Sequence, residues 1–170
     1  MQKWRKADVS CAERLGFRGG ACVALGSGVN EQTELTLPHS DITDRVIAGF
    51  YVVHRELGYG FSENIYRRAI SIALRDDGLD AIEEQSITVT FRGRLIGSFH
   101  ADIVVAGVVL VEVKAAATIE NYAQAQILNY LKAAGGGVGL LLNFGRQASF
   151  KRFVMGDATN SLPALCAKPR

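Results

Sequence analysis

Cysteine is scarce in this sequence, and its spacing excludes a cysteine-based metal site. The 170 residues include three cysteines, at positions 11, 22 and 166, with no CxxC and no cysteine–histidine motif. This odd, widely spaced set predicts neither a disulfide framework nor a zinc site. A reducing, cytoplasmic environment therefore fits the composition best.

Long hydrophobic runs are also missing. No segment approaches the roughly 18 consecutive apolar residues of a membrane span. The start of the chain, MQKWRKADVSCAERLGFRGG, carries positive charge but lacks the uninterrupted apolar core of a signal peptide. We therefore expect a soluble, intracellular protein that does not contact a membrane.

The sequence has no strong excess of either charge. It contains 19 basic and 17 acidic residues, a formal net charge of +2, which gives no bulk argument for nucleic acid. The segment from Leu131 to Arg170 is locally cationic, since Asp157 is its single acidic residue. That segment is equally compatible with a surface that meets phosphates and with an ordinary solvated basic surface.

The length favours one globular domain. Residues 1–38 mix glycine, serine, charged and short apolar stretches without a helical or strand period, which predicts a poorly ordered N-terminal extension. We place the folded domain at residues 39–156 and a C-terminal tail at residues 157–170.

Two helices are predicted at the start of this domain. Asp41 is the expected cap of the first helix, and Ser62 that of the second, which should end at Asp77-Gly78. The apolar faces at helical spacing are Ile42, Val46, Phe50, Val53 and Leu57 in the first helix, and Ile65, Ala69, Ile72 and Ala73 in the second.

A strand-rich region follows, interrupted by one further helix. Arg92-Gly93 and Ala106-Gly107 are the expected turns, and the helix should span about Thr118 to Ala133. The expected strands are residues 86–91, 95–99, 101–105, 108–113, 138–144 and, at the edge of the sheet, 150–155. The order ααβββ(β)αββ predicts an α/β fold in which helices flank a mixed central β-sheet.

Two charged residues interrupt the apolar stretch VVLVEVKAA, Val108–Ala116. Glu112 and Lys114 share one face of the strand because side chains repeat every two positions. A carboxylate within a buried strand is unfavourable unless it is paired or bound to a metal. Glu112 therefore needs a partner, and the candidates are Lys114 and Asp102.

The length of the turn decides whether Asp102 can reach Glu112. With two residues in the turn, Asp102 pairs with Val111 and faces away from Glu112. With three residues, Asp102 lies directly opposite Glu112. The sequence leaves both registers open.

The three-residue register would create a metal site. Carboxylates whose Cβ atoms lie about 4.5–5.5 Å apart repel each other unless a cation joins them. Oxygen ligands without cysteine favour Mg²⁺ or Mn²⁺, and the ammonium of Lys114 would orient a water or neutralise charge on a phosphate. Alternatively, Glu112 and Lys114 form a structural ion pair and Asp102 faces solvent.

The arrangement of Asp102, nine intervening residues and Glu112-Val113-Lys114 resembles the D…(D/E)xK core of the PD-(D/E)XK nuclease superfamily. The stretch LGYGFSENIYRRAI, with Gly60, Glu63 and Tyr66, is similar to the signature of the GxxExxY proteins, a bacterial branch of that superfamily. The likeness continues through QSITVTFRGRLIGSFHADIVV, VLVEVKA, AQILNYL and GLLLNFG. Ala101 stands where the superfamily's name has proline.

The resemblance implies a restriction-endonuclease-like core and a role for each matching residue. Asp102 and Glu112 would hold Mg²⁺ or Mn²⁺, with the Val113 carbonyl as a further ligand, and Lys114 would be the catalytic lysine. Glu63 would add a carboxylate to the metal site. Gln126 and Tyr130 match a QxxxY element that lies near the site and the nucleic acid in exonuclease-like branches.

The sequence is compatible with three functions. The first is a magnesium-dependent nuclease acting on DNA, with RNA as the alternative substrate. The second is a non-catalytic module with the same fold that binds nucleic acid or a protein partner. The third is a structural homo-oligomer that pairs through the expected edge strand, Phe150 to Met155. The sequence does not fix the oligomeric state.

Overall fold

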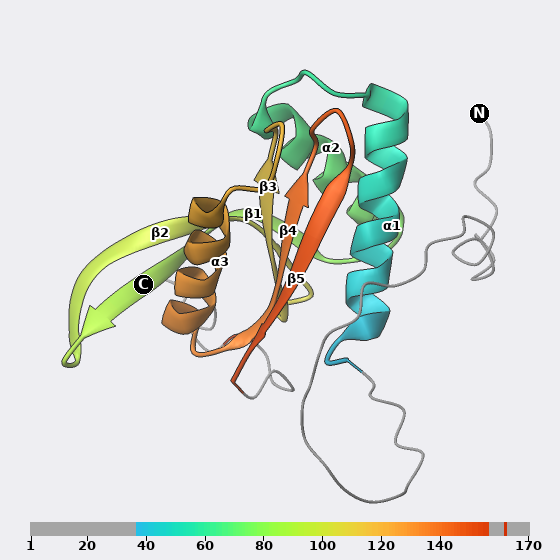
Figure 1. The fold of residues 1–170 in the computed structure, drawn as a ribbon. Coiled ribbons are helices and arrows are strands. Elements are labelled where there is room, and N and C mark those ends of the chain that lie inside the picture. The colour runs from blue at the N-terminus through green and yellow to red at the C-terminus, as the bar shows by residue number, and fades with distance from the viewer. Residues whose placement is uncertain (1–36, 157–161, 163–170) are drawn as a thin grey trace, which may run out of the picture. The chain divides into compact units, whose positions relative to one another are not determined.

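The computed structural model describes residues 37–156 and residue 162, all within the unit Leu35–Arg170. In chain order the elements are α1 (Ser40–Leu57), α2 (Glu63–Asp76), β1 (Ala81–Phe91), β2 (Arg94–Val105), β3 (Val109–Lys114), α3 (Asn121–Ala134), β4 (Gly137–Asn143) and β5 (Ser149–Met155) (Figure 1). The predicted extension and tail lie outside the described residues, apart from residues 37, 38 and 162. No helix in the described part is long and apolar enough to span a membrane.

The five strands form one mixed sheet in the order β1-β2-β3-β4-β5. All neighbours are antiparallel except β3 and β4, which are parallel. A parallel pair needs a crossover connection, and α3 supplies it. The predicted α/β class and the edge position of β5 are therefore confirmed. The two stretches expected as separate strands, residues 95–99 and 101–105, are one continuous strand, β2.

Helices cover both faces of the sheet (Figure 1). The helices α1 and α2 pack against the face that carries Val109, Val111 and Val113, while α3 packs against the face that carries Leu110 and Leu141. Strands covered on both faces read as continuous apolar runs, which explains why β3 and β4 show little alternation. Glu112 therefore occupies the centre of a two-sided core.

Two details of the helices correct the sequence expectations. Asp41 is not a cap, because α1 begins at Ser40 with His39 as the preceding residue and no side-chain capping bond. On α2, Ser62 does occupy the capping position. The expected apolar face of α2 is correct only in part, because Ala69 and Ala73 pack against the core while Ile65 and Ile72 are exposed. The buried face is rotated and carries Tyr66, Ile70, Ser71 and Leu74.

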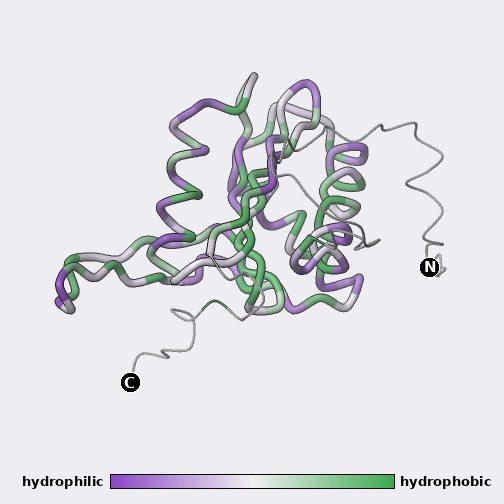
Figure 2. The backbone as a smooth tube through the Cα atoms, turned by 60° about the horizontal axis from the view of Figure 1, so that its bottom comes forward, coloured by the Kyte–Doolittle hydropathy of each residue, from purple (hydrophilic) through white to green (hydrophobic). Residues whose placement is uncertain are grey.

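The strands β1 and β2 extend beyond the rest of the sheet as a two-stranded arm, residues 88–98, hereafter the hairpin arm. Figures 1 and 2 both show it projecting from the body of the domain. Every residue from 90 to 98 is exposed. At the base of the arm, Phe99 stacks on Tyr130 of α3 with ring centroids 3.8 Å apart.

Candidate active site

The turn between β2 and β3 contains three residues. Val105 pairs with Val109, which leaves Ala106, Gly107 and Val108 in the turn, and Ile103 pairs with Val111. Continued by one residue, this register places Asp102 opposite Glu112. Of the two alternatives that the sequence left open, the structure has the one that brings these two carboxylates together.

Asp102 lies where β2 separates from β3. Backbone pairing with β3 ends at Ile103, and the Asp102 carboxylate replaces the next backbone contact by accepting a 2.8 Å hydrogen bond from the Val113 N–H. The alternation of faces also breaks here, because Ile103 packs on the α1 and α2 side while Ala101 packs on the α3 side. The carboxylate is thereby held at the open edge of β3.

Glu112 is buried and bonded to Lys114. The Lys114 ammonium donates to Glu112 Oε1 at 2.7 Å, and the Glu112 side chain is 4% exposed. The other oxygen, Glu112 Oε2, is buried and has no hydrogen-bond partner within the described residues. The expectation that Lys114 partners Glu112 holds, yet the carboxylate is only half satisfied. A buried oxygen without a partner is costly, so this atom is available to a ligand.

Glu63 reaches the same region from a different element. It is the first residue of α2, and its Oε1 accepts a 3.3 Å hydrogen bond from the N–H of Ala115, directly after Lys114. Burial is the largest cause of the raised pKa values of Asp102 and Glu112, and the charge of Glu63 adds a smaller effect in the same direction. The negative charges of three carboxylates, one each from α2, β2 and β3, therefore act on one another.

Tyr66 holds the loop that places Glu63. This tyrosine is fully buried, and its hydroxyl donates to the Gly58 carbonyl at 2.8 Å and accepts from the Phe61 N–H at 3.2 Å. Its ring stacks on Phe144 with centroids 4.3 Å apart. Tyr66 is therefore a core aromatic with a satisfied hydroxyl, and its hydrogen bonds fix the entry of α2.

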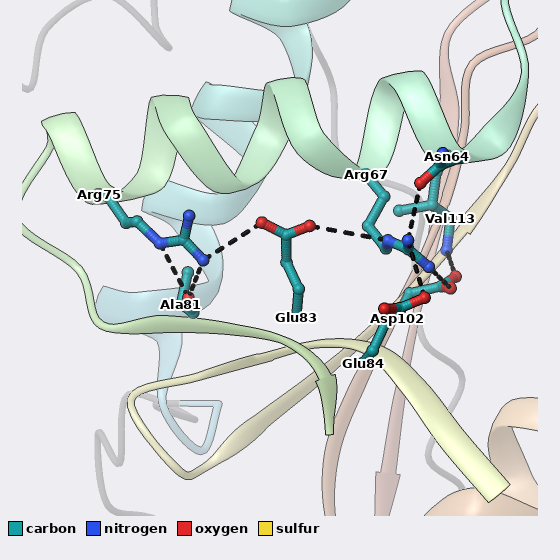
Figure 3. A network of polar contacts seen from close by, with 8 residues as sticks. All are labelled: Asn64, Arg67, Arg75, Ala81, Glu83, Glu84, Asp102 and Val113. Atoms are coloured by element: carbon teal, nitrogen blue, oxygen red, sulfur yellow. Dashed lines mark hydrogen bonds and ion pairs between the residues drawn. The ribbon is translucent and has the colours of Figure 1, made fainter. Parts of the chain in front are cut away.

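Arg67 is a contributor that the sequence analysis missed. It lies one turn after Glu63 on α2, and its guanidinium lies 3.7 Å from Asp102 Oδ1 and 2.9 Å from Glu84 (Figure 3). The same guanidinium donates to Asn64 Oδ1 at 2.7 Å and lies 3.8 Å from Glu83 Oε2. The i, i+4 spacing from Glu63 was the available signal.

A second missed residue fixes the loop after Lys114. Asn143 is fully buried at the end of β4, opposite Lys114 in the parallel register. Its side-chain amide accepts from the Ala116 N–H at 2.9 Å and donates to the Ala116 carbonyl at 3.0 Å. A polar residue that ends an apolar strand, as in VGLLLN, is the sequence signal that could have identified it.

The ionisation of the site reflects its burial. Burial, together with the nearby charge of Asp102, raises the pKa of Glu112 to about 7, although the hydrogen bond from Lys114 acts in the opposite direction. Burial also raises the pKa of Asp102, outweighing its bond to Val113 and the charges of Lys114 and Arg67. Burial alone would lower the pKa of Lys114, but the bond to Glu112 and the surrounding carboxylates raise it above its ordinary value.

Gln126 and Tyr130 lie on α3 and bond to each other. The Gln126 amide donates to the Tyr130 hydroxyl at 2.6 Å, and the Tyr130 ring stacks on Phe99. No hydrogen bond in the described part of the chain joins either residue to Asp102, Glu112 or Lys114. Their predicted part in the site stays a prediction, as does that of the Val113 carbonyl.

The chemistry of the donors fits a hard divalent cation. The available atoms are carboxylate oxygens, the ligands that Mg²⁺ and Mn²⁺ prefer, and Glu112 Oε2 lacks any other partner among the described residues. Within those residues, no group of three or more histidine, cysteine, aspartate or glutamate side chains is already arranged as a metal site. A cation at Asp102 and Glu112 would complete its coordination with water and phosphate beyond the ligands that the chain supplies, as Mg²⁺ commonly does.

Comparisons with known proteins give one family and one solved structure. A family model described as the PD-(D/E)XK nuclease superfamily matches residues 40–153, from the start of α1 into β5. A search of curated proteins gives no match. A solved structure described as "Crystal structure of SSO0001" is similar at a TM-score of 0.45 and 15% identity, over 68% of this chain and 58% of the other.

Proposed function

The chain belongs to the PD-(D/E)XK nuclease superfamily, and we propose that it is a nuclease that hydrolyses phosphodiester bonds of DNA, with RNA as the alternative substrate. The observation that carries the proposal is the register of β2 and β3, whose last pair is Ile103 and Val111 and which, continued by one residue, brings Asp102 opposite Glu112. Lys114 bonds to the same glutamate at 2.7 Å. Carboxylates beside an ammonium are suited to metal-assisted attack of water on a phosphodiester.

The cofactor of this proposal is Mg²⁺ or Mn²⁺, which nucleases of this superfamily generally use. Asp102 and Glu112 would hold it, with Glu63 and the Val113 carbonyl as further ligands. Such an ion supplies a Lewis acid that acidifies a water and stabilises charge on the phosphate. The unpartnered Glu112 Oε2 supports this assignment.

Lys114 acts as a fixed positive charge in this proposal. Its pKa lies above the ordinary lysine value because of the surrounding carboxylates, so it stays protonated near neutral pH. A protonated amine cannot accept a proton from water. The ammonium instead orients the attacking water and stabilises negative charge on the phosphate.

Membership of the GxxExxY branch is part of the proposal. Gly60, Glu63 and Tyr66 supply its pattern. The contacts of Tyr66 with the Gly58–Phe61 loop give that pattern a physical basis, because they place Glu63 beside β3. Gln126 and Tyr130 would contact nucleic acid from α3.

A cleavage panel tests the activity. The wild-type protein is incubated with single-stranded, duplex and branched DNA and with RNA, in Mg²⁺ and in Mn²⁺. Lys114→Ala should lower the cleavage rate by roughly 10²–10³-fold, the usual effect of removing one electrostatic group from a transition state. Lys132→Ala, which removes an exposed lysine from α3, is the matched control and should cleave like the wild type.

A metal titration tests the site independently of the substrate. Millimolar Mg²⁺ or Mn²⁺ should raise the melting temperature, because a ligand that binds the folded state stabilises it. Asp102→Asn and Glu112→Gln should abolish the shift, and Asp76→Asn, an exposed carboxylate at the end of α2, should keep it. Absence of any shift in the wild type would count against the metal site.

One observation favours a second function, a non-catalytic module that binds nucleic acid or a protein. Lys114 already bonds Glu112 and Arg67 lies beside Asp102, so cations of the chain itself partly neutralise the carboxylates. Metal-independent binding of nucleic acid with no cleavage of any substrate in the panel would select this function over the first.

A further inference from the structure

The hairpin arm exposes apolar side chains that the body of the domain does not cover. Phe91, Leu95 and Ile96 are 59%, 67% and 65% exposed. The register shifts between Val89 and Thr90, which adds a residue to the facing strand and twists the arm. Phe91 pairs with Arg94 and Leu95 pairs with Thr90. Because these two pairs are adjacent along the ribbon, Phe91 and Leu95 lie on opposite faces. Apolar groups therefore point outward on both faces.

The charge of the arm has one sign. Between Glu84 and Asp102 the sequence contains no acidic residue, and it places Arg92 and Arg94 at the tip. Neither arginine forms an ion pair with any carboxylate in the described part of the chain. Arg92 lies over the Phe91 ring, 5.2 Å from its centroid. Figure 2 shows this hydrophilic tip beside hydrophobic segments of the same ribbon.

The backbone at the tip has a conformation that suits arginine poorly. Phe91 pairs with Arg94, which leaves a two-residue turn, and Arg92 and Gly93 have φ values of 51° and 73°. A turn with positive φ at both positions favours Asn-Gly or Asp-Gly. A long side chain in the left-handed region is strained, and such strain points to a role outside folding.

We propose that the hairpin arm is a docking element that inserts into a groove of duplex nucleic acid, with Arg92 and Arg94 on phosphates and the apolar side chains against the groove walls. This inference rests on the nucleic-acid substrate of the proposed function and assigns a surface to it. A two-stranded ribbon fits the major groove of a duplex, which is about 12 Å wide. The acid-free tip is complementary to phosphate, whereas the arms of two copies would bring like charges together.

The length of the arm allows one duplex to meet both the tip and the carboxylates. Asp102 lies eight positions after Arg94 on the single strand β2, a span of at most about 26 Å at roughly 3.3 Å per residue. One turn of duplex is about 34 Å long. The arm therefore contacts a bound duplex within one turn of the site of cleavage.

Binding without cleavage tests the arm. The full chain in EDTA is titrated into a labelled DNA duplex of about two turns, roughly 20 base pairs, and anisotropy is followed over a range of salt. Arg92→Asn should weaken binding about fivefold near physiological salt and lower the salt slope by about 1, while the melting temperature stays equal or rises. Leu95→Thr with Ile96→Thr should also weaken binding, with little change in the slope.

Lys151→Asn is the matched control, because it removes one exposed positive charge from β5, the opposite edge of the sheet from β1. Equal losses for Arg92→Asn and Lys151→Asn would overturn the proposal, since they would indicate a net-charge effect. So would a wild type that fails to bind the duplex, or a dimer that Leu95→Thr with Ile96→Thr converts to a monomer.

The outcome separates this inference from the nuclease. If the wild type binds the duplex through the arm but does not cleave it in Mg²⁺ or Mn²⁺, the nuclease proposal fails and the docking element stands. If the wild type cleaves and Arg92→Asn binds as tightly as the wild type, the docking element fails and the nuclease stands.

Discussion

The two ends of β2 present opposite physical situations. Its C-terminal end, Ala101–Val105, lies in the core and carries a single charged group, Asp102, among buried apolar residues. Its N-terminal end, Arg94–Gly97, lies in solvent and carries apolar groups, Leu95 and Ile96, next to an arginine. One strand thus holds a partly buried carboxylate among core residues at one end and hydrophobic side chains exposed to water at the other.

The difference shows which kind of partner each end lacks. A buried carboxylate is unfavourable without a cation. Near the C-terminal end of β2, hereafter the inner end, Lys114 and Arg67 partly supply that positive charge, and Glu112 Oε2 still has no partner among the described residues. Exposed apolar groups lose nothing when covered and gain from burial. The inner end therefore lacks a small cation. The N-terminal end, hereafter the outer end, lacks a large surface that would cover its apolar groups.

The largest expected effect is a difference in the free energy of unfolding between a substitution in the core and one in the hairpin arm. Leu140→Ala, in the buried strand β4 beside β3, should lower the free energy of unfolding by about 2–5 kcal/mol, because it opens a cavity between packed layers. Leu95→Ala in the hairpin arm should change it by no more than about 0.5 kcal/mol. Urea denaturation measures both. A comparable loss for Leu95→Ala would show that the arm is part of the core.

The pH dependence of stability tests the inner end alone. Glu112 has a folded pKa of about 7, above its ordinary value of 4.5, so the folded protein binds more protons than the unfolded chain between these values. Stability of the metal-free protein should therefore fall as pH rises from about 4.5 to about 7, by at most about tenfold in the folding equilibrium per pH unit for one proton. The raised pKa of Asp102 acts in the same direction.

Glu112→Gln provides the control, since glutamine keeps the shape of the side chain and cannot ionise. Thermal melts at several pH values in EDTA should show a flatter profile for this variant than for the wild type. A wild-type profile that rises over the same window would contradict the direction of the Glu112 pKa shift. Mg²⁺ should reduce the fall, because it binds the ionised carboxylates.

The pattern of apolar residues was sufficient to predict most of the fold. Helical spacing located α1 and α2, and the apolar runs located β3 and β4, because burial on both faces leaves a direct trace in the sequence. The break expected between residues 99 and 101 did not occur, since strand pairing with β1 continues through His100. Local composition could not show that neighbouring strand.

The sequence could name candidate site residues but not the geometry that joins them. The number of residues in the turn after Val105 decided whether Asp102 faces Glu112, and local sequence was compatible with both answers. Arg67 and Asn143 were missed because their roles depend on Asp102 and Ala116, contacts between segments far apart in the chain. The rotated face of α2 has a similar cause: Tyr66 can be buried because its hydroxyl donates a hydrogen bond to the Gly58 carbonyl.

A smaller effect concerns how firmly the inner end is held. Tyr66→Phe removes the hydroxyl that joins the buried ring to the Gly58–Phe61 loop, so that the Gly58 carbonyl and the Phe61 N–H each lose a hydrogen bond. The free energy of unfolding should fall by about 1–3 kcal/mol, and cleavage should fall further than stability explains because Glu63 loses its placement. Tyr122→Phe, at an exposed tyrosine of α3, should change neither quantity.

The smallest effect belongs to the tip of the outer end and has the opposite sign. Arg92 has a φ of 51°, a conformation that asparagine adopts more readily than arginine. Arg92→Asn should therefore raise the free energy of unfolding by about 0.5–1 kcal/mol, a part of the roughly 1–3 kcal/mol that such strain stores, as measured by urea denaturation. A substitution that strengthens the fold while weakening duplex binding would show that the residue at this tip serves a partner outside the chain. A loss of stability would instead show that Arg92 contributes to the turn, and the contrast between the two ends of β2 would weaken.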